Sequence, residues 1–316
     1  DIEVAEAVTL SGQFVIQTAA KAVNELMNKA CATDDKNYII AVDTDSNYVA
    51  MGDFVKQKKF KDPIEALDKF SKVVVEPQLK RAFASYYDAT NGMVPRMEMS
   101  REVIANRGFW TKKKRYVLNV LDDEGVRLAK PKLKIMGVEA IKSSTPEVCR
   151  DSMKGIFKVM IEEGESAAQK YVEAAKAEFY KQPPERIAFP RSVSDLTKYS
   201  PERQGEAYSK PSSGGVPINS RAALLHNHYL KKLGIDKFRP LIQNGDKMKF
   251  IYLKLPNPIR ENVIGFTDEI PEEFGLGDYV DYDLQFEKVY LKPIRSIFEV
   301  LKWSIEPVND LQAFFA

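Results

Sequence analysis

Two aspartates flank a threonine in the segment Asp43-Thr44-Asp45-Ser46, and their spacing is the sharpest chemical feature of the sequence. Carboxylates two positions apart at the tip of a hairpin can project to one side on short, stiff side chains. Mg²⁺ prefers such oxygen ligands and usually keeps several waters and substrate phosphate oxygens as well. Two such ions can hold the attacking and leaving oxygens of an in-line phosphoryl transfer. The alternative is an ordinary turn, in which Asp and Ser serve only as hydrogen-bonding turn residues.

A second feature is the densest positive run of the chain, Gly108-Phe109-Trp110-Thr111-Lys112-Lys113-Lys114-Arg115-Tyr116. Aromatic side chains bracket its cations, and aromatics interleaved with Lys and Arg suit a surface that binds a nucleic-acid backbone. The alternative is an edge strand that its lysines protect from pairing with other chains.

The composition fits a soluble globular protein large enough for two domains. The chain has 316 residues, 44% of them hydrophobic and 29% charged, with 47 Lys and Arg against 45 Asp and Glu. These values exclude a collagen, a disulfide-rich mini-protein and a wholly disordered chain. No run approaches the roughly 18 apolar residues of a membrane span. Cys31 and Cys149 suggest no disulfide framework, which fits a reducing, cytoplasmic compartment. With a net charge of only +2, any basic surface must be local.

Helices and an antiparallel sheet are expected in the first part of the chain. The helical spacing of Val15, Ala19, Ala22, Leu26 and Ala30 predicts an opening helix. The pattern also predicts strands at 38–42 and 47–51, which form a hairpin around Asp43–Ser46, and a helix over 62–89 that Pro77 bends or divides. Three further strands are expected at 96–105, 116–121 and 126–136, the last two joined by a turn at 122–125. The fold class is therefore α+β.

The pattern changes near Gly137, and a domain boundary is expected there. A helix opens at Pro146-Glu147, and its apolar stripe comprises Met153, Ile156, Phe157, Met160 and Ile161. A second helix ends at 183–184, a long loop rich in Pro, Gly and Ser follows over 199–217, and two more helices are expected at 220–233 and near 290–304.

The order of the motifs resembles family B replicative DNA polymerases of the T-even bacteriophage type. The matching segments are A-E-A-V-T-L-S-G-Q-F at 5–14, D-T-D-S at 43–46, R-E at 101–102, G-F-W-T-K-K-K-R-Y-V-L-N-V at 108–120 and L-K-I-M-G-V-E-A-I-K-S-S-T-P at 133–146. The resemblance implies the C-terminal part of a polymerase palm, an antiparallel sheet with long helices, over residues 1–137. A mostly helical thumb would follow over 138–308, and a clamp-binding tail over 309–316.

The resemblance also implies roles for individual residues. Asp45, supported by Asp43, would bind the metal, and Glu102 would tune this catalytic site. The expected DNA-binding residues are Lys113, Lys114, Arg115, Tyr116, Lys142, Ser143, Ser144, Arg221, Lys288 and Lys292. The sequence departs from the family pattern at three places. Ala41-Val42 stands where Tyr-Gly is usual, Asn106-Arg107-Gly108 is shorter and poorer in glycine than the family's loop, and Asn262 stands where a lysine is expected.

The family's exonuclease domain, first palm motif and fingers have no counterpart in this sequence. The chain also opens at Asp1 rather than at an initiator Met, so it looks like a piece of something longer. Two-metal chemistry needs carboxylates from both palm motifs, so we expect the chain to be inactive alone. It is either a truncated frame or the C-terminal subunit of a split polymerase, which would need a separate N-terminal subunit as its partner.

The tail carries Leu311, Phe314 and Phe315, an aliphatic residue followed three positions later by two aromatics. This spacing resembles the sliding-clamp-binding tails of replicative polymerases. The alternative is a tail that docks on its own thumb.

The resemblance therefore implies a DNA-directed DNA polymerase portion that uses two Mg²⁺ ions, primer–template DNA, dNTPs and a sliding clamp in the cytoplasm of a host cell, with no membrane. The rival interpretation is a non-catalytic module that binds DNA and the clamp.

Overall fold

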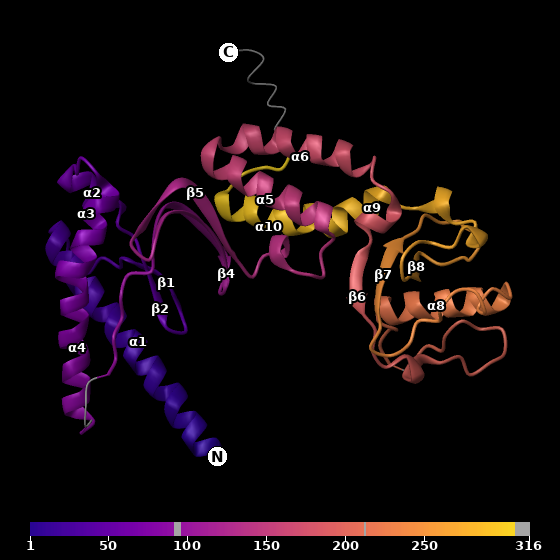
Figure 1. The fold of residues 1–316 in the computed structure, drawn as a ribbon, viewed down its shortest axis with the longest axis horizontal. Helices are drawn as coiled ribbons and strands as arrows, with labels where there is room; N and C mark the ends of the chain where they lie inside the picture. The colour runs from indigo at the N-terminus through magenta and orange to yellow at the C-terminus, as the bar shows by residue number, and fades with distance from the viewer. Residues whose placement is uncertain (92–95, 212, 307–316) are drawn as a thin grey trace, which may run out of the picture. The chain divides into compact units, whose positions relative to one another are not determined.

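A computed structural model describes residues 1–91, 96–211 and 213–306 of the chain (Figure 1). The chain divides into two compact units, residues 1–134 and 135–316, whereas the sequence places the boundary after residue 137. Both units combine helices with antiparallel strands, so the predicted α+β class is confirmed.

Unit 1 contains two long helices, two short ones and two small sheets. Its helices are α1 (Ile2–Cys31), α2 (Gly52–Lys58), α3 (Pro63–Phe70) and α4 (Glu76–Ala89), and its strands are β1 (Ile39–Asp43), β2 (Ser46–Val49), β3 (Val103–Lys112), β4 (Arg115–Asp123) and β5 (Val126–Met136). The last two residues of β5 already belong to unit 2. Strands β1 and β2 form one sheet, and β3, β4 and β5 form another in that order.

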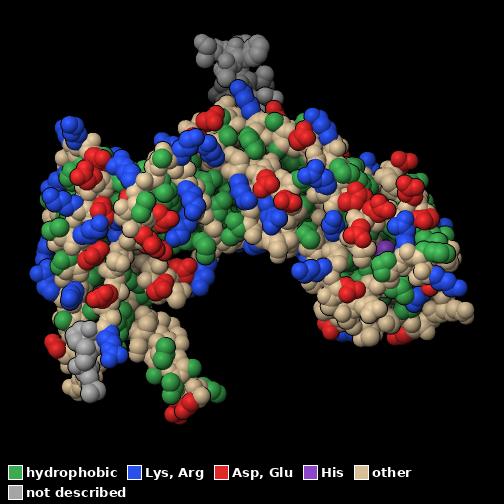
Figure 2. Space-filling view, viewed as in Figure 1, with side chains coloured by type: hydrophobic (Ala, Val, Ile, Leu, Met, Phe, Trp, Pro, Cys, Tyr) green, Lys and Arg blue, Asp and Glu red, His purple; other side chains and the backbone are tan. Residues whose placement is uncertain are grey.

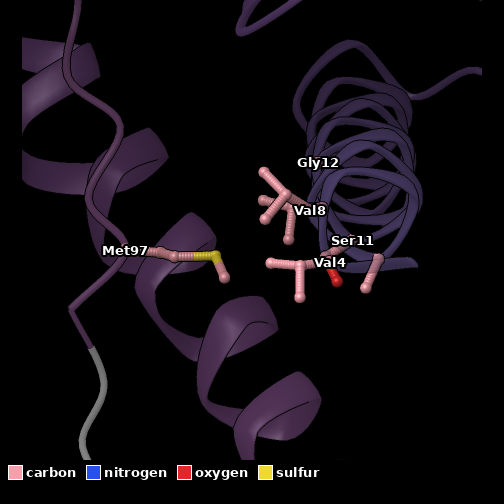
Figure 3. A pocket seen from close by; sticks show the side chains of 7 residues that line it. Val4, Val8, Ser11, Gly12 and Met97 are labelled. Carbon is pink, nitrogen blue, oxygen red and sulfur yellow. The ribbon is translucent and has the colours of Figure 1, made fainter. Parts of the chain in front are cut away.

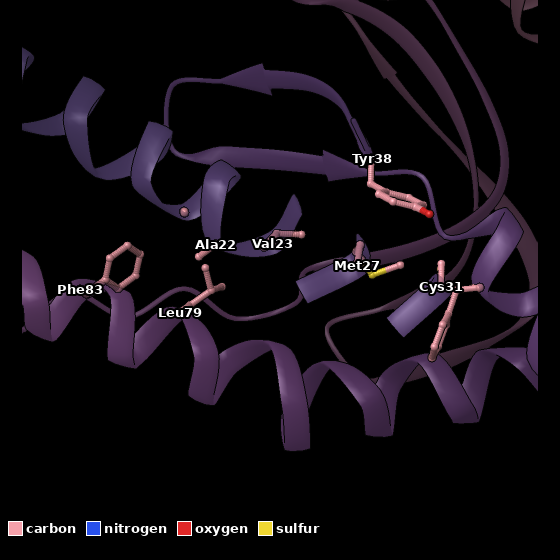
Figure 4. Packing of buried hydrophobic residues seen from close by; sticks show 9 residues of the cluster. Ala22, Val23, Met27, Cys31, Tyr38, Leu79 and Phe83 are labelled. Atoms are coloured by element: carbon pink, nitrogen blue, oxygen red, sulfur yellow. The ribbon is translucent and has the colours of Figure 1, made fainter. Parts of the chain in front are cut away.

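The core of unit 1 lies between α1 and α4. Ala22, Val23 and Met27 of α1 face Leu79 and Phe83 of α4, and Tyr38 and Cys31 extend the cluster (Figure 4). The predicted apolar positions of α1 are partly correct, because Ala19 and Ala22 are buried while Val15, Leu26 and Ala30 are only partly so. The buried face is instead completed by Ile16, Val23, Met27 and Cys31.

The first half of α1 leaves apolar side chains exposed, including Val4 and Val8. Together with Ser11, Gly12 and Met97 they line a shallow pocket of about 500 Å³ (Figure 3).

The predicted helix at 62–89 is interrupted just before Pro77. Between α3 and α4 the chain forms a π-helical turn, Ser71–Val75. A proline inside a helix offers no N–H and its ring collides with the carbonyl four residues earlier, here that of Val73. A π-helical turn widens the backbone at this point and accommodates the ring.

The strand predicted at 96–105 is wrong for most of its length, because regular pairing begins only at Val103. Before Val103, backbone amides form hydrogen bonds with side chains of α4 instead of with a neighbouring strand. The amides of Arg96 and Met97 donate to the Tyr87 hydroxyl, and the amide of Arg101 donates to the Glu76 carboxylate. The other two strand predictions and the turn between them are confirmed by β4 and β5.

Unit 2 is largely helical and holds one further sheet. Its helices are α5 (Glu147–Glu162), α6 (Glu165–Phe179), α7 (Pro184–Ile187), α8 (Ile218–Lys232), α9 (Tyr282–Phe286) and α10 (Lys292–Leu301), with a π-helical turn (Glu287–Leu291) between the last two. Strands β6 (Phe189–Ser192), β7 (Lys247–Tyr252) and β8 (Val263–Phe266) form an antiparallel sheet that the sequence did not predict. The entire predicted stripe of α5 is buried, as expected for its 3.6-residue spacing.

A buried histidine on α8 should make the stability of unit 2 depend on pH. His226 is 2% exposed, and burial lowers the pKa of its imidazole. In the unfolded chain the same group takes up a proton below about pH 6.5, its usual pKa. The unfolded state then binds more protons, so the free energy of unfolding should fall as the pH drops below that value, by up to about 1.4 kcal/mol per pH unit.

We expect His226→Phe to remove most of this pH dependence, and His228→Gln, a change at a less buried site on the same helix, to leave it largely in place. Urea unfolding between pH 5 and 7, followed through Trp303 in a chain whose Trp110 is replaced by Phe, measures the slope. An unchanged slope in the His226 variant would contradict the assignment.

Candidate metal and nucleic-acid site

The predicted acidic hairpin is confirmed, and it presents both aspartates at its tip. Asp43 ends β1 and pairs with Ser46, which begins β2, so Thr44 and Asp45 form the two-residue loop. Thr44 adopts a left-handed φ of 54°, which lets the chain reverse within two residues. The Thr44 hydroxyl donates to Asp43 Oδ1 at 3.1 Å, and the Ser46 hydroxyl donates to Asp45 Oδ1 at 3.3 Å.

The basic run also forms a hairpin rather than one continuous strand. β3 ends at Lys112 and β4 begins at Arg115, so Lys113 and Lys114 are the loop residues, and Lys114 has a φ of 61°. Trp110 pairs with Tyr116 across this hairpin. The lysines of residues 112–114 are exposed, as a surface for an anionic partner requires.

The two hairpins meet at Lys114. Its ammonium Nζ lies 3.5 Å from Asp43 Oδ1 and donates to the Thr44 hydroxyl at 3.4 Å. The Asp43 side chain is 20% exposed, whereas the Lys114 side chain is 60% exposed. The structure therefore brings together two residues that the sequence assigned to separate motifs, one for metal and one for DNA.

Three aromatic rings also connect the two hairpins. Tyr48 of β2 packs against Trp110 and Tyr116, with ring centroids 5.5 and 5.2 Å away. The Tyr48 hydroxyl donates to the Tyr116 hydroxyl at 2.7 Å. Tyr116, expected to contact DNA, is only 4% exposed, so its ring belongs to the core of the hairpin.

Glu102 lies just before β3 with its side chain largely exposed, and its Oε2 accepts a hydrogen bond from Lys134 at 3.2 Å. Burial, the hydrogen bond with Tyr116, and the negative charges of Asp43 and Glu102 all raise the pKa of Tyr48 above its usual value.

Arg101, next to Glu102, is a residue whose role the sequence did not reveal. Its guanidinium makes ion pairs with Asp68 of α3 and, at 2.6 Å, with Asp122 of β4. Arg101 is 10% and Asp122 6% exposed at the side chain, so this pairing ties α3 to the sheet from within the fold. Its partners lie 33 and 21 positions away in the sequence, too far for any local pattern to show them.

The acidic hairpin supplies ligands of the right kind for Mg²⁺, but only two of them. Across residues 1–91, 96–211 and 213–306, no three His, Cys, Asp or Glu side chains come together as a metal-binding group. Mg²⁺ is often held by one or two carboxylates with substrate phosphates and water as the other ligands. Asp43 and Asp45 therefore fit one side of such a site.

In unit 2 the expected DNA-binding residues differ in how freely they can reach a partner. Lys288 and Lys292 are exposed, while Lys142 is exposed but bonded to Glu139 at 3.0 Å. Arg221 is more enclosed: it lies 3.6 Å from Glu261 and donates to Asn262 at 2.7 Å, and its side chain is 24% exposed.

Ser143 is exposed and Ser144 half-buried, and the Ser144 carbonyl accepts a hydrogen bond from Arg191 at 2.5 Å. The proposed clamp-binding residues Leu311, Phe314 and Phe315 lie outside the described residues.

On the face shown in Figure 2, Lys and Arg side chains alternate with Asp and Glu side chains, in keeping with the net charge of +2. In the part of the chain that the structure describes, no helix has the length and apolar character needed to span a membrane.

Two hairpins that present acidic and basic side chains side by side are typical of proteins that bind phosphate groups. Comparisons with known proteins show which kind of phosphate-binding protein this chain is similar to. The chain is 30% identical over 333 aligned residues to the DNA-directed DNA polymerase of Enterobacteria phage T4. It is 33% identical over 335 aligned residues to the DNA-directed DNA polymerase of Escherichia phage RB69. Both alignments cover all of this chain but only 36% of each relative. No family model matches the chain.

The resemblance to phage DNA polymerases that the motifs indicate is therefore confirmed. The chain spans about a third of the length of these relatives. The similarity alone therefore does not assign the activity of the complete polymerases to this chain.

Proposed function

We propose that this chain is the C-terminal palm and thumb portion of a family B DNA-directed DNA polymerase. The observation that carries the proposal is the contact between Lys114 and Asp43, which unites a carboxylate hairpin with a lysine hairpin in one surface. Similarity along the full chain to two phage polymerases supports it.

In this proposal each hairpin has a distinct task. Asp45 and Asp43 hold Mg²⁺, which when bound stabilises the negative charge that develops on the reacting phosphate. Lys113, Lys114 and Arg115 hold the phosphates of the primer strand, and charged contacts of this kind position DNA without reading its sequence. Glu102 tunes the site through the negative charge of its own, largely exposed carboxylate.

Unit 2 would act as the thumb and hold the duplex behind the primer end. We assign phosphate contacts to Lys142, Ser143, Ser144, Lys288 and Lys292. Arg221 would join them only after its contact with Glu261 opens, because the two side chains are paired in the free protein.

The proposed partners are primer–template DNA, dNTPs and, through Leu311, Phe314 and Phe315, a sliding clamp in the host cytoplasm. If the polymerase is split, a separate N-terminal subunit joins them.

A second candidate function is a non-catalytic module that binds DNA and the clamp. One observation favours it: the described residues contain no third metal ligand beside Asp43 and Asp45. Nucleotide incorporation that depends on Asp45, once the rest of a polymerase is supplied, separates the two functions.

Binding to primed duplex DNA tests the surface itself. Each phosphate that a lysine neutralises releases counterions, so binding weakens as the salt concentration rises. A plot of the logarithm of the binding constant against the logarithm of the salt concentration should have a slope of roughly −0.9 for each phosphate contact. We expect Lys114→Ala and Lys288→Ala each to reduce this slope by about one and to weaken binding equally on unrelated sequences.

The matched control is Lys80→Ala, which removes the same charge from the exposed face of α4, away from the proposed surface. It should leave the slope unchanged. Fluorescence anisotropy of a labelled duplex over a range of salt concentrations measures all three variants. If Lys114→Ala behaves like Lys80→Ala, the hairpin surface is wrongly assigned.

A further inference from the structure

The acidic hairpin and the sheet that carries the basic hairpin are separate pieces of backbone. In the described part of the chain, β1 and β2 pair only with each other, and β3, β4 and β5 form their own sheet. No backbone ladder therefore fixes the distance between Asp43 and the lysines. Side chains must do so.

The two faces of β2 make different contacts. Successive strand residues point to opposite faces, and Val49 packs into the core cluster with α1 and α4. Tyr48, its neighbour, therefore points the other way, and it packs against the cluster of Tyr116, Leu118 and Val120 in the second sheet. Ser46, two residues earlier, lies on the same face as Tyr48.

Asp43 shares that face, because residues paired across two strands project to the same side and Asp43 pairs with Ser46. The carboxylate and the Tyr48 ring are therefore directed together toward the second sheet. The Lys114–Asp43 pair is exposed to solvent at its lysine end, and contacts of this kind hold two elements weakly. The more buried link is Tyr48, through two ring contacts and a hydrogen bond of 2.7 Å.

We propose that Tyr48 is a positioning residue, which fixes the acidic hairpin to the basic hairpin and thereby sets where Asp43 and Asp45 lie relative to bound DNA. That Tyr48 links the two hairpins is argued from the contacts alone. That this link affects DNA binding rests on the proposed function. In this proposal the ligands of metal and phosphate are Asp43, Asp45 and the lysines, and Tyr48 acts only through them. Its ring supplies the packing, and its hydroxyl sets the orientation against Tyr116.

Hydrogen exchange of the free chain, without DNA, tests whether Tyr48 links the two hairpins. We expect Tyr48→Phe, which loses only the hydroxyl, to speed exchange of the amides of residues 39–49 about fivefold. Tyr48→Leu, which loses the ring contacts as well, should speed it at least about thirtyfold. Amides of α1 and α4 should keep their protection in both variants, because their core does not include the lost contacts.

The matched control is Tyr86→Leu, which removes a half-buried ring that packs on Phe14 and Tyr87, away from the hairpins. It should leave exchange in residues 39–49 unchanged. Acceleration spread evenly over unit 1 in Tyr48→Leu, or none at residues 39–49, would overturn the inference. If Tyr48→Leu does not fold, Tyr48→Phe decides in the same way: faster exchange confined to the hairpin supports the inference, and unchanged exchange overturns it.

Affinity for primed duplex DNA tests the consequence. We expect Tyr48→Leu to weaken binding about tenfold, and Tyr48→Phe, which keeps the ring, to restore affinity to within about threefold of the natural chain. If the natural chain itself binds no DNA, the proposed function fails, while the exchange result still decides the role of Tyr48. If the natural chain binds DNA and Tyr48→Leu binds it equally well, the positioning role is wrong.

Discussion

The purified 316-residue chain should incorporate no nucleotide on a primed template at any Mg²⁺ concentration, with a rate at least about 10⁴-fold below that of a complete polymerase. In-line phosphoryl transfer by two ions needs carboxylates that hold both of them. The described residues offer Asp43 and Asp45, with no third ligand in place to complete the group. Primer extension with a labelled primer measures the rate, with the phage T4 polymerase as the active standard.

The control for this experiment is the same chain with Asp45→Asn, which keeps the size of the side chain and removes its charge. Extension that appears in the natural chain and disappears in this variant would contradict the expectation, because it would show a complete catalytic centre. Equal extension by both would identify a contaminating polymerase, and the assay is then repeated on chain freed of it.

Arg101→Met should destabilise unit 1 by about 3–5 kcal/mol, the cost of leaving a buried charge without its partner. The Arg101 guanidinium Nη1 lies 2.6 Å from Asp122 Oδ1, and both side chains are almost fully buried. Methionine fills a similar volume but leaves the Asp122 carboxylate unpaired. Urea unfolding followed through Trp110, in a chain whose Trp303 is replaced by Phe, reports the free energy of unfolding of this unit.

Lys72→Met is the matched control, because Lys72 pairs with the same Asp68 that Arg101 contacts, but at the surface. An exposed pair of this kind contributes about 0–1 kcal/mol. Arg101→Met combined with Asp122→Asn should recover part of the loss, since the buried charge is then absent. A cost for Arg101→Met no larger than that for Lys72→Met would show that the enclosed pair is not important for stability.

Local patterns predicted the parts of the fold that local forces decide. The stripe of α5 repeats every 3.6 residues and is buried as expected. The turn after β4 places Glu124 and Gly125 at φ values of 50° and 88°, the left-handed conformation that such a two-residue turn needs. The sequence pattern predicted a strand over 96–105, but before Val103 side chains of α4 accept hydrogen bonds from backbone amides that a strand partner would otherwise take.

In the candidate site, too, the local features were predictable from the sequence and the contacts between distant residues were not. The acidic hairpin was predictable, because its two strands and its polar tip are contiguous in the sequence. Its contact with Lys114 was not, since 70 residues separate the loops that meet there. Tyr48 was missed for the same reason: an aromatic residue on a short strand gives no sign of the partner 68 positions away.

In the proposed function the acidic hairpin lies at the primer end of bound DNA. An iron–EDTA group attached to a cysteine at position 45 tests it most directly, because the radicals it releases cut only nearby nucleotides. Labelling can be selective, since the natural cysteines, Cys31 and Cys149, are both buried. The control carries the same group at position 85, where Ser85→Cys places it on the exposed side of α4.

With the Asp45→Cys conjugate and a primed template, we expect cuts concentrated within a few nucleotides of the primer 3′ end, in both strands, and no such concentration with the Ser85→Cys conjugate. Cuts spread evenly along the duplex, or the same pattern from both conjugates, would contradict the proposal that this hairpin is the metal-binding edge of a polymerase site.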